Sequence, residues 1–101
     1  MRPLATEFRK DGYAFRLLDR LNDVALFEKT SGAVVSWEVV VVQKHPERTI
    51  AGNLIPAAEA MPPAESWGQK GWTLTTHARA VEKMAEVVAR EAEREAAKVS
   101  A

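Results

Sequence analysis

The chain contains no cysteine among its 101 residues. Disulfide frameworks, thiolate catalysis and cysteine-ligated zinc sites are therefore excluded, and a reducing compartment is permitted. Histidine is also scarce, since only His45 and His77 occur, and they do not stand at the spacing of a ligand pair on a helix or turn. We therefore expect neither a metal site nor a cofactor.

Long apolar runs and an excess of charge of either sign are absent as well. No apolar run is longer than Val39–Val42, which is far short of the roughly 20 residues that span a bilayer. The first residues also lack the apolar stretch of a signal peptide. Basic and acidic residues number 14 each, whereas a duplex-DNA binder usually carries a basic excess on one element. The composition predicts a cytoplasmic protein without membrane contact.

Length and composition fit one small globular domain. With 47% apolar and 28% charged residues, the chain lies far from the composition of disordered proteins. Residues 1–11 are polar and unpatterned, which predicts a flexible N-terminal arm. Residues 12–96 are expected to form a single α+β domain, and residues 97–101 a frayed C-terminal tail.

Alternating apolar and polar residues predict strands over 13–18, 24–29 and 34–44, and the short connections between them favour antiparallel hairpins. Residues 34–44 give the strongest pattern, because valines on both faces indicate a central strand. Residues 49–55 predict a short hairpin with a turn at Gly52-Asn53. Residues 72–75 predict a last strand.

From residue 77 the pattern changes to that of a helix. Thr76 is expected to cap its first amide groups, and one apolar face should pack on the sheet. The predicted fold is α+β, an antiparallel β-meander of four to five strands with one long C-terminal helix packed on one face. The end of the helix could also pair with a second copy, so a homodimer is a further expectation. The apolar face of the predicted helix consists of Val81, Met84, Ala85, Val88 and Ala92.

Residues 62–72 hold two of the three tryptophans, together with two prolines and two glycines. Because indole is the largest side chain and glycine and proline fix backbone shape, this segment predicts one stable conformation. Trp67 and Trp72 could form a platform for bases or for side chains of a partner. They could equally anchor an irregular loop onto the sheet or helix, and the sequence leaves this choice open.

Catalytic arrangements are not found. Ser31, Ser36 and Ser66 lack the flanking glycines of a nucleophile elbow, and Gly68–Gly71 lacks the spacing of a phosphate-binding loop. Glu59 and Glu65 could act as an acid–base pair, but capping or loop hydrogen bonds account for such residues more simply. We therefore expect a binding protein that is not an enzyme.

Two kinds of partner are compatible with the sequence. Single-stranded nucleic acid could bind across the open sheet, where cations would hold phosphates and a ring would stack a base; the candidates are Arg16, Lys29, Trp37, Lys44 and Arg48. Alternatively, the chain is a protein–protein interaction module, such as an inhibitor or regulator of a host protein, because tryptophan is enriched at interface hot spots. The candidates for that contact are Trp67, Lys70 and Trp72.

The spacing of Glu59, Pro62 and Glu65, followed by Trp67-Gly68 and Gly71-Trp72, resembles that of small uncharacterised proteins from phages and bacterial mobile elements. The strand around Trp37 and the hairpin that contains Gly52 extend this resemblance, which covers residues 13–88. It implies a phage or mobile-element context and no particular chemistry. The order of a meander followed by one long helix also resembles the folds of single-strand-binding transcriptional coactivators and of plant Whirly proteins. This second likeness concerns the fold alone.

Overall fold

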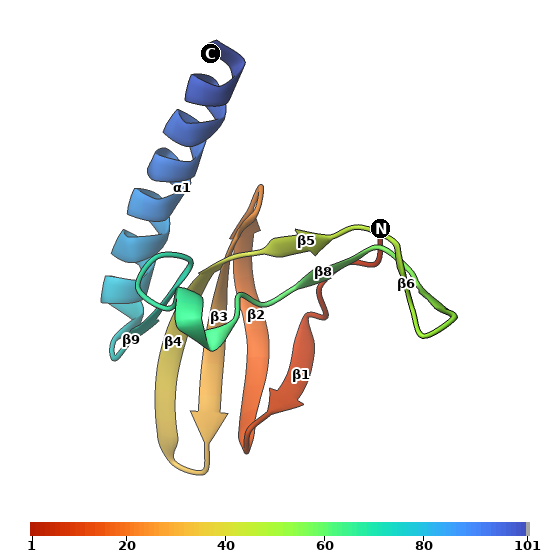
Figure 1. The fold of residues 1–101 in the computed structure, drawn as a ribbon. Coiled ribbons are helices and arrows are strands. Elements are labelled where there is room, and N and C mark those ends of the chain that lie inside the picture. Colours follow the sequence, from red (N-terminus) through yellow and green to blue (C-terminus); the bar gives the residue numbers. More distant parts are fainter. Residues whose placement is uncertain (101) are drawn as a thin grey trace.

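The computed structural model describes residues 1–100 and confirms the predicted α+β class (Figure 1). Five antiparallel strands form one sheet in the order β1-β2-β3-β4-β9, so the meander continues from β1 to β4 and β9 joins its far edge. One long helix, α1 (His77–Ser100), follows β9. The strands are β1 (Glu7–Lys10), β2 (Tyr13–Leu21), β3 (Val24–Ser31), β4 (Val34–Val41) and β9 (Gly71–Leu74).

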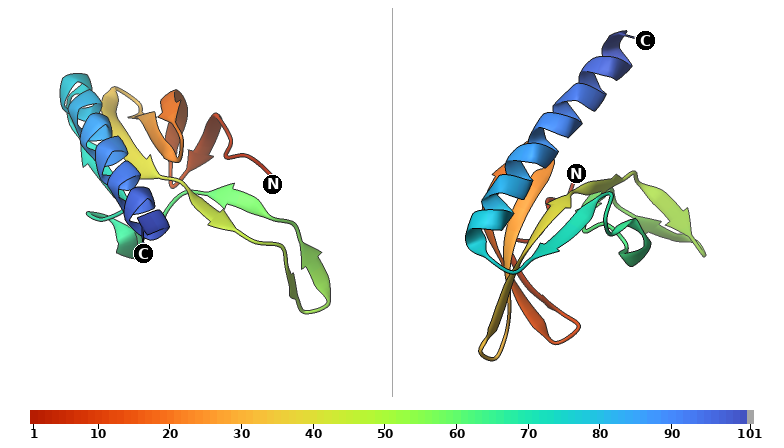
Figure 2. Two further views of the ribbon diagram at one scale, coloured as in Figure 1. Left: turned by 90° about the horizontal axis from the view of Figure 1, so that it is seen from above. Right: turned by 90° about the vertical axis from the view of Figure 1, so that its left-hand side faces the viewer.

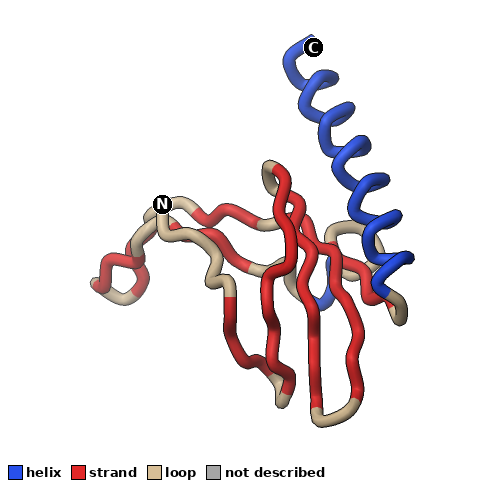
Figure 3. The backbone as a smooth tube through the Cα atoms, turned by 180° about the vertical axis from the view of Figure 1, so that it is seen from behind, coloured by secondary structure: helices blue, strands red, loops and turns tan. Residues whose placement is uncertain are grey.

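Between β4 and β9 the chain leaves the sheet and returns as a two-stranded arm, which projects away from the rest of the molecule (Figure 2). We call residues 43–60 the hairpin arm. At its base β5 (Gln43–His45) pairs with β8 (Ala58–Ala60), and at its tip β6 (Arg48–Ile50) pairs with β7 (Asn53–Ile55). A short 3-10 helix, η1 (Ala64–Ser66), then leads the chain back to β9. The hairpin arm and η1 thus lie between β4 and β9 in the sequence, whereas the two strands are neighbours in the sheet. Figure 3 shows this path of the chain from behind.

The helix packs on one side of the sheet, which we call the helix side. Its first turn is capped as predicted, because the hydroxyl of Thr76 accepts a hydrogen bond of 3.2 Å from the amide of Arg79. Among residues 1–100, no helix is both long enough and apolar enough to cross a membrane. The core on the helix side contains Val24, Leu26, Val39, Val41, Ala80, Met84 and Val87.

The buried face of α1 is rotated by about one position from the predicted face. Met84 is buried and Val88 packs against the core as expected, but Ala80 and Val87 complete the contact. Val81 is 50% exposed, and Ala85 and Ala92 are exposed too. Alanine is small enough to lie on the buried or on the exposed face of a helix. Ala85 and Ala92 were therefore counted in the predicted apolar face although both are exposed.

The opposite side of the sheet, which we call the far side, has its own core. Phe8 stacks on Phe15 with ring centroids 4.8 Å apart, and both rings approach Phe27 edge-on. Residues 7–10, expected to belong to a flexible arm, therefore form strand β1. At the other end α1 continues into the predicted tail 97–101 as far as Ser100, and Ala101 lies outside the described residues. The far-side core contains Phe15, Ala25, Phe27, Val40 and Val42.

The turn at the tip of the hairpin arm differs from the predicted Gly52-Asn53. Ala51 and Gly52 form it, with φ values of 52° and 79°. Positive φ at both central residues is the pattern of a type I′ turn, whose twist suits a hairpin. Asn53 instead belongs to β7 and pairs with Ile50.

Candidate functional site

The residues predicted to contact nucleic acid do not share one surface. Arg16 and Trp37 both lie opposite Glu28 in the sheet register, which places all three on the helix side. Lys29 is the next residue along β3, so its side chain lies on the far side. Lys44 and Arg48 belong to the hairpin arm. The prediction of a single cationic face is therefore wrong, because successive side chains of a strand alternate between the two sides.

Three of the four predicted phosphate-binding cations already have carboxylate partners. Nη2 of Arg16 lies 3.3 Å from Oε1 of Glu28. Nζ of Lys29 lies 2.9 Å from Oε1 of Glu38, and Nζ of Lys44 lies 3.2 Å from Oδ1 of Asp23. The fourth cation, Arg48, is exposed on the arm. These ion pairs lower the positive potential that a phosphate backbone would meet.

The predicted partner-binding residues Trp67, Lys70 and Trp72 also separate. The indole of Trp72 lies on the helix side, with the guanidinium of Arg90 4.9 Å from its ring centroid. Lys70 forms an ion pair of 3.8 Å with Glu91. Trp72 and Lys70 therefore attach the loop to α1, and only Trp67 turns to the far side.

A pocket of about 270 Å³ opens beside Trp67 on the far side, and we call it the aromatic pocket. Strands β2, β3, β4 and β9 supply its floor, and the segment before and after η1 supplies one wall. The pocket brings together two residues predicted for different partners, Lys29 and Trp67. Its main lining residues are Tyr13, Phe15, Lys29, Glu38, Met61, Pro62, Trp67 and Thr73.

Trp67 is exposed and yet fixed in position. Its side chain is 37% exposed, while its indole Nε1 donates a hydrogen bond of 3.1 Å to the hydroxyl of Thr73. The ring lies directly on Gly71, where an added Cβ would stand 2.5 Å from a ring carbon. The absence of a side chain at Gly71 therefore allows the indole to pack flat against β9.

The floor of the aromatic pocket carries a neutralised ion pair. Glu38 is only 4% exposed, and its carboxylate accepts a hydrogen bond of 2.9 Å from Lys29 Nζ. The same ammonium lies 4.2 Å from the ring centroid of Tyr13, a favourable cation–π distance. A buried carboxylate requires such a partner, so this part of the pocket has no net charge.

Sequence reasoning missed Tyr13, Glu38 and Thr73 as parts of a site. A signal for Glu38 was present, because it alternates with Val40 and Val42 on an apolar face and so needed a buried cation. The cation is Lys29, and it can be identified only when the pairing of β3 with β4 is known. In that register Lys29 lies opposite Ser36 and so next to Glu38. No sequence signal placed Trp67 against strand β9.

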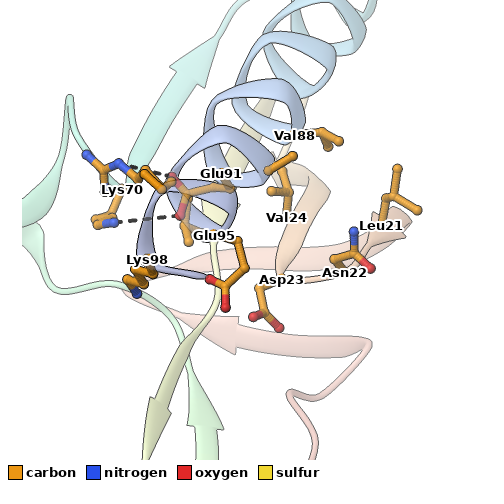
Figure 4. Close-up of a pocket in the computed structure, with 13 residues that line it drawn as sticks. Leu21, Asn22, Asp23, Val24, Lys70, Val88, Glu91, Glu95 and Lys98 are labelled. Carbon is orange, nitrogen blue, oxygen red and sulfur yellow. Dashed lines mark ion pairs between the residues drawn. The ribbon is translucent and has the colours of Figure 1, made fainter. Parts of the chain in front are cut away.

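A second and larger cavity lies between α1 and the β2–β3 turn (Figure 4). It measures about 520 Å³, and we call it the helix groove. Apolar side chains such as Val24 and Val88 line its interior, and Glu91 forms an ion pair there with Lys70, as Figure 4 shows. Its rim carries further charges from Asp23, Arg94, Glu95 and Lys98.

Of the two acid–base candidates, Glu59 is engaged in structural contacts, whereas Glu65 is exposed in η1. Glu59 accepts two hydrogen bonds of 2.7 Å from the guanidinium of Arg20 and one of 3.0 Å from the amide of Leu4. These bonds, those from Arg20 above all, lower the pKa of Glu59 from 4.5 to about 2. Such a carboxylate stays ionised at neutral pH and is a poor proton donor. Within residues 1–100, histidine, aspartate and glutamate form no group of three or more that could hold a metal ion.

Comparison of the chain with protein-family models, with curated proteins and with solved structures finds no match. The assignment of a function therefore depends on the geometry of this molecule.

Proposed function

We propose that the chain is a non-enzymatic protein-binding module whose contact surface is the aromatic pocket around Trp67. The observation that carries the proposal is the fixed, exposed indole of Trp67. A rigid tryptophan at a pocket rim loses little conformational entropy on binding, which is the property of interface hot spots.

The charge of the pocket supports a protein partner. The Lys29–Glu38 pair is neutral as a unit, and the walls that surround it are mostly apolar or aromatic. An apolar or aromatic side chain of a partner fits such a surface, since it displaces water without leaving a charge unpaired. The phage or mobile-element context that the resemblance implies is compatible with a host protein as that partner.

Affinity capture from a lysate of the cell in which the protein acts tests this function. We expect that the wild-type chain captures a partner and that Trp67→Ala loses it, with a drop in affinity of about tenfold or more. Val34→Ala is the matched control, because Val34 is an apolar side chain with 66% exposure at the β3–β4 turn. Retention of every partner by Trp67→Ala would contradict the proposal.

Single-stranded nucleic acid is the second candidate, because the aromatic pocket does combine Lys29 with the rings of Tyr13 and Trp67. Fluorescence anisotropy with a labelled strand of about 30 nucleotides, longer than the ~4–16 that one small domain covers, separates the two candidates. We expect no binding at low salt. Binding that weakens steeply with salt and is lost in Lys29→Ala would favour nucleic acid instead.

A further inference from the structure

The chain exposes more surface than a compact protein of its mass. Its accessible surface is 6777 Å², whereas a compact monomer of 11.2 kDa exposes about 5,700 Å². Its radius of gyration is 14.9 Å, compared with about 13 Å for a compact domain of this length. The excess, about 1,100 Å², is larger than the ~800 Å² that each partner buries in a standard interface.

Two projecting elements are exposed along their length. All residues of α1 from Ala92 to Val99 are exposed, so the last turns of the helix lack a packing surface. The tip of the hairpin arm is exposed throughout residues 44–56. A short helical segment and an isolated two-stranded hairpin are each marginally stable in water, so both benefit from a partner.

The base of the arm is nevertheless held firmly. Arg20, near the end of β2, donates two hydrogen bonds to the carboxylate of Glu59. The amide of Arg2 donates to the carbonyl of Ala57, and the carbonyl of Arg2 accepts from the amide of Glu59. The arm is therefore presented in one direction, which lowers the entropy lost when it docks.

The two faces of the arm differ in what they present. In the β6–β7 register Arg48 lies opposite Ile55 and Ile50 lies opposite Asn53, so these four residues share one face. Ile50 is 50% exposed and Ile55 is 38% exposed. Leu54, which is 64% exposed, lies on the other face with Thr49. The first face therefore combines two aliphatic side chains with a cation.

The helix groove complements this face. Aliphatic side chains such as Leu21, Val24 and Val88 line part of its interior, and its volume of about 520 Å³ accommodates the aliphatic side chains of the arm. Its rim carries the exposed carboxylate of Glu95, together with Arg94 and Lys98. Within the described residues 1–100, neither Glu95 nor Arg48 takes part in an ion pair. A cation on the arm and an acid at the groove are thus both available for a contact between two chains.

We infer that the chain forms a two-fold homodimer in which the arm of each copy enters the helix groove of the other. Ile50 and Ile55 contact the aliphatic part of the groove, and Arg48 pairs with Glu95 of the second copy. Reciprocal exchange makes the contact twice and closes the assembly at two chains. The zero net charge of the chain leaves no long-range repulsion between copies. The aromatic pocket takes no part, so this inference stands or falls separately from the proposed function.

Sedimentation equilibrium across a range of concentrations tests the dimer. We expect a species of twice 11.2 kDa, and at least a tenfold weaker association for Ile50→Asp. Leu54→Asp is the matched control, because it places the same charge on the opposite face of the same arm and should leave the dimer intact. A monomer at every concentration, species larger than two chains, or equal effects of the two variants would overturn the inference.

A charge exchange tests the pairing of Arg48 with Glu95. Arg48→Glu and Glu95→Arg should each weaken the dimer, and the double variant should restore it. Circular dichroism shows whether each variant is folded. Failure of the double variant to recover association while it remains folded contradicts the proposed contact.

Site-directed crosslinking gives a further readout, because the chain has no cysteine of its own. One population carrying Ile50→Cys is mixed with another carrying Ala92→Cys, and a bismaleimide is added. We expect covalent heterodimers from this mixture and few from a mixture in which Val34→Cys replaces Ile50→Cys. Equal yields from both mixtures would count against docking of the arm in the groove.

Discussion

At the scale of single residues, the position of one indole depends on the absence of one Cβ. Trp67 lies flat on Gly71 and donates its ring N–H to Thr73. The backbone supports the same arrangement, since the amide of Gly68 donates to the carbonyl of Gly71 at 2.7 Å. Both glycines are thus needed for geometry, and Gly68 adopts a φ of 92° that other residues rarely reach.

Gly71→Ala is expected to destabilise the fold by about 1–3 kcal/mol, because the new methyl group overlaps the indole ring. Urea denaturation measures the change in the free energy of unfolding. The control is the same substitution in a Trp67→Ala background, where the overlap is gone and the change should fall below about 0.5 kcal/mol. Equal losses in the two backgrounds would show that the ring is not the cause.

Glu59 predicts a specific pH dependence. Its pKa falls from 4.5 to about 2 in the folded chain, so the folded state favours the ionised form and binds fewer protons than the unfolded state. The resulting stability is fully present above about pH 4.5 and is lost as the pH falls toward 2. At pH 7, Glu59→Gln should lower the free energy of unfolding by about 1.5–3 kcal/mol.

Urea denaturation of both proteins between pH 7 and pH 2 measures this difference. It should shrink steadily below about pH 4.5. A difference that stays constant down to pH 2 would mean that Arg20 and Leu4 do not hold the ionised carboxylate.

At the scale of elements, the orientation of α1 about its own axis decides which of its side chains are buried and stabilise the fold. Val87 is 2% exposed and packs on the sheet, whereas Val81 is 50% exposed. The beginning of the helix was predictable, because the Thr76 cap is a local signal. The buried face was not, since it depends on where β3, β4 and β9 present their apolar side chains.

Val87→Ala should therefore destabilise the chain by about 2 kcal/mol through loss of buried methyl groups. Val81→Ala makes the same chemical change on the same helix and should alter stability by less than about 0.5 kcal/mol. Thermal or urea unfolding followed by circular dichroism compares the two. A larger loss for Val81→Ala would place the other face of α1 against the sheet.

Most strands were predictable from alternation, and residues 13–18 and 24–29 lie in strands as expected. The predicted strand 34–44 is divided, because β4 ends at Val41 and residues 43–45 form β5 in the hairpin arm. Strand β1 was not predictable, because its one apolar side chain, Phe8, gives no visible period in a polar segment. Its strand conformation comes from stacking on Phe15 across the hairpin. The candidate site was less predictable than the fold, since the side on which Lys29 or Trp67 lies depends on register and on the path of the loop.

At the scale of the whole molecule, the sheet separates two surfaces that have different chemistry. The far side holds the aromatic pocket with its fixed indole and neutral ion pair. The helix groove and the hairpin arm lie away from this pocket, and each combines aliphatic with charged side chains. In the account proposed above, one surface binds a different protein while the others would join two copies of the chain.

Photo-crosslinking at position 67 tests the central claim most directly. A photoreactive benzoyl-phenylalanine replaces Trp67, the protein is irradiated in the cell in which it acts, and the crosslinked product is digested separately with protease and with nuclease. We predict a discrete adduct that protease degrades and nuclease leaves unchanged, and no such adduct when the same group replaces Val34. An adduct that nuclease removes, or no adduct at position 67, would contradict recognition of a protein by the aromatic pocket.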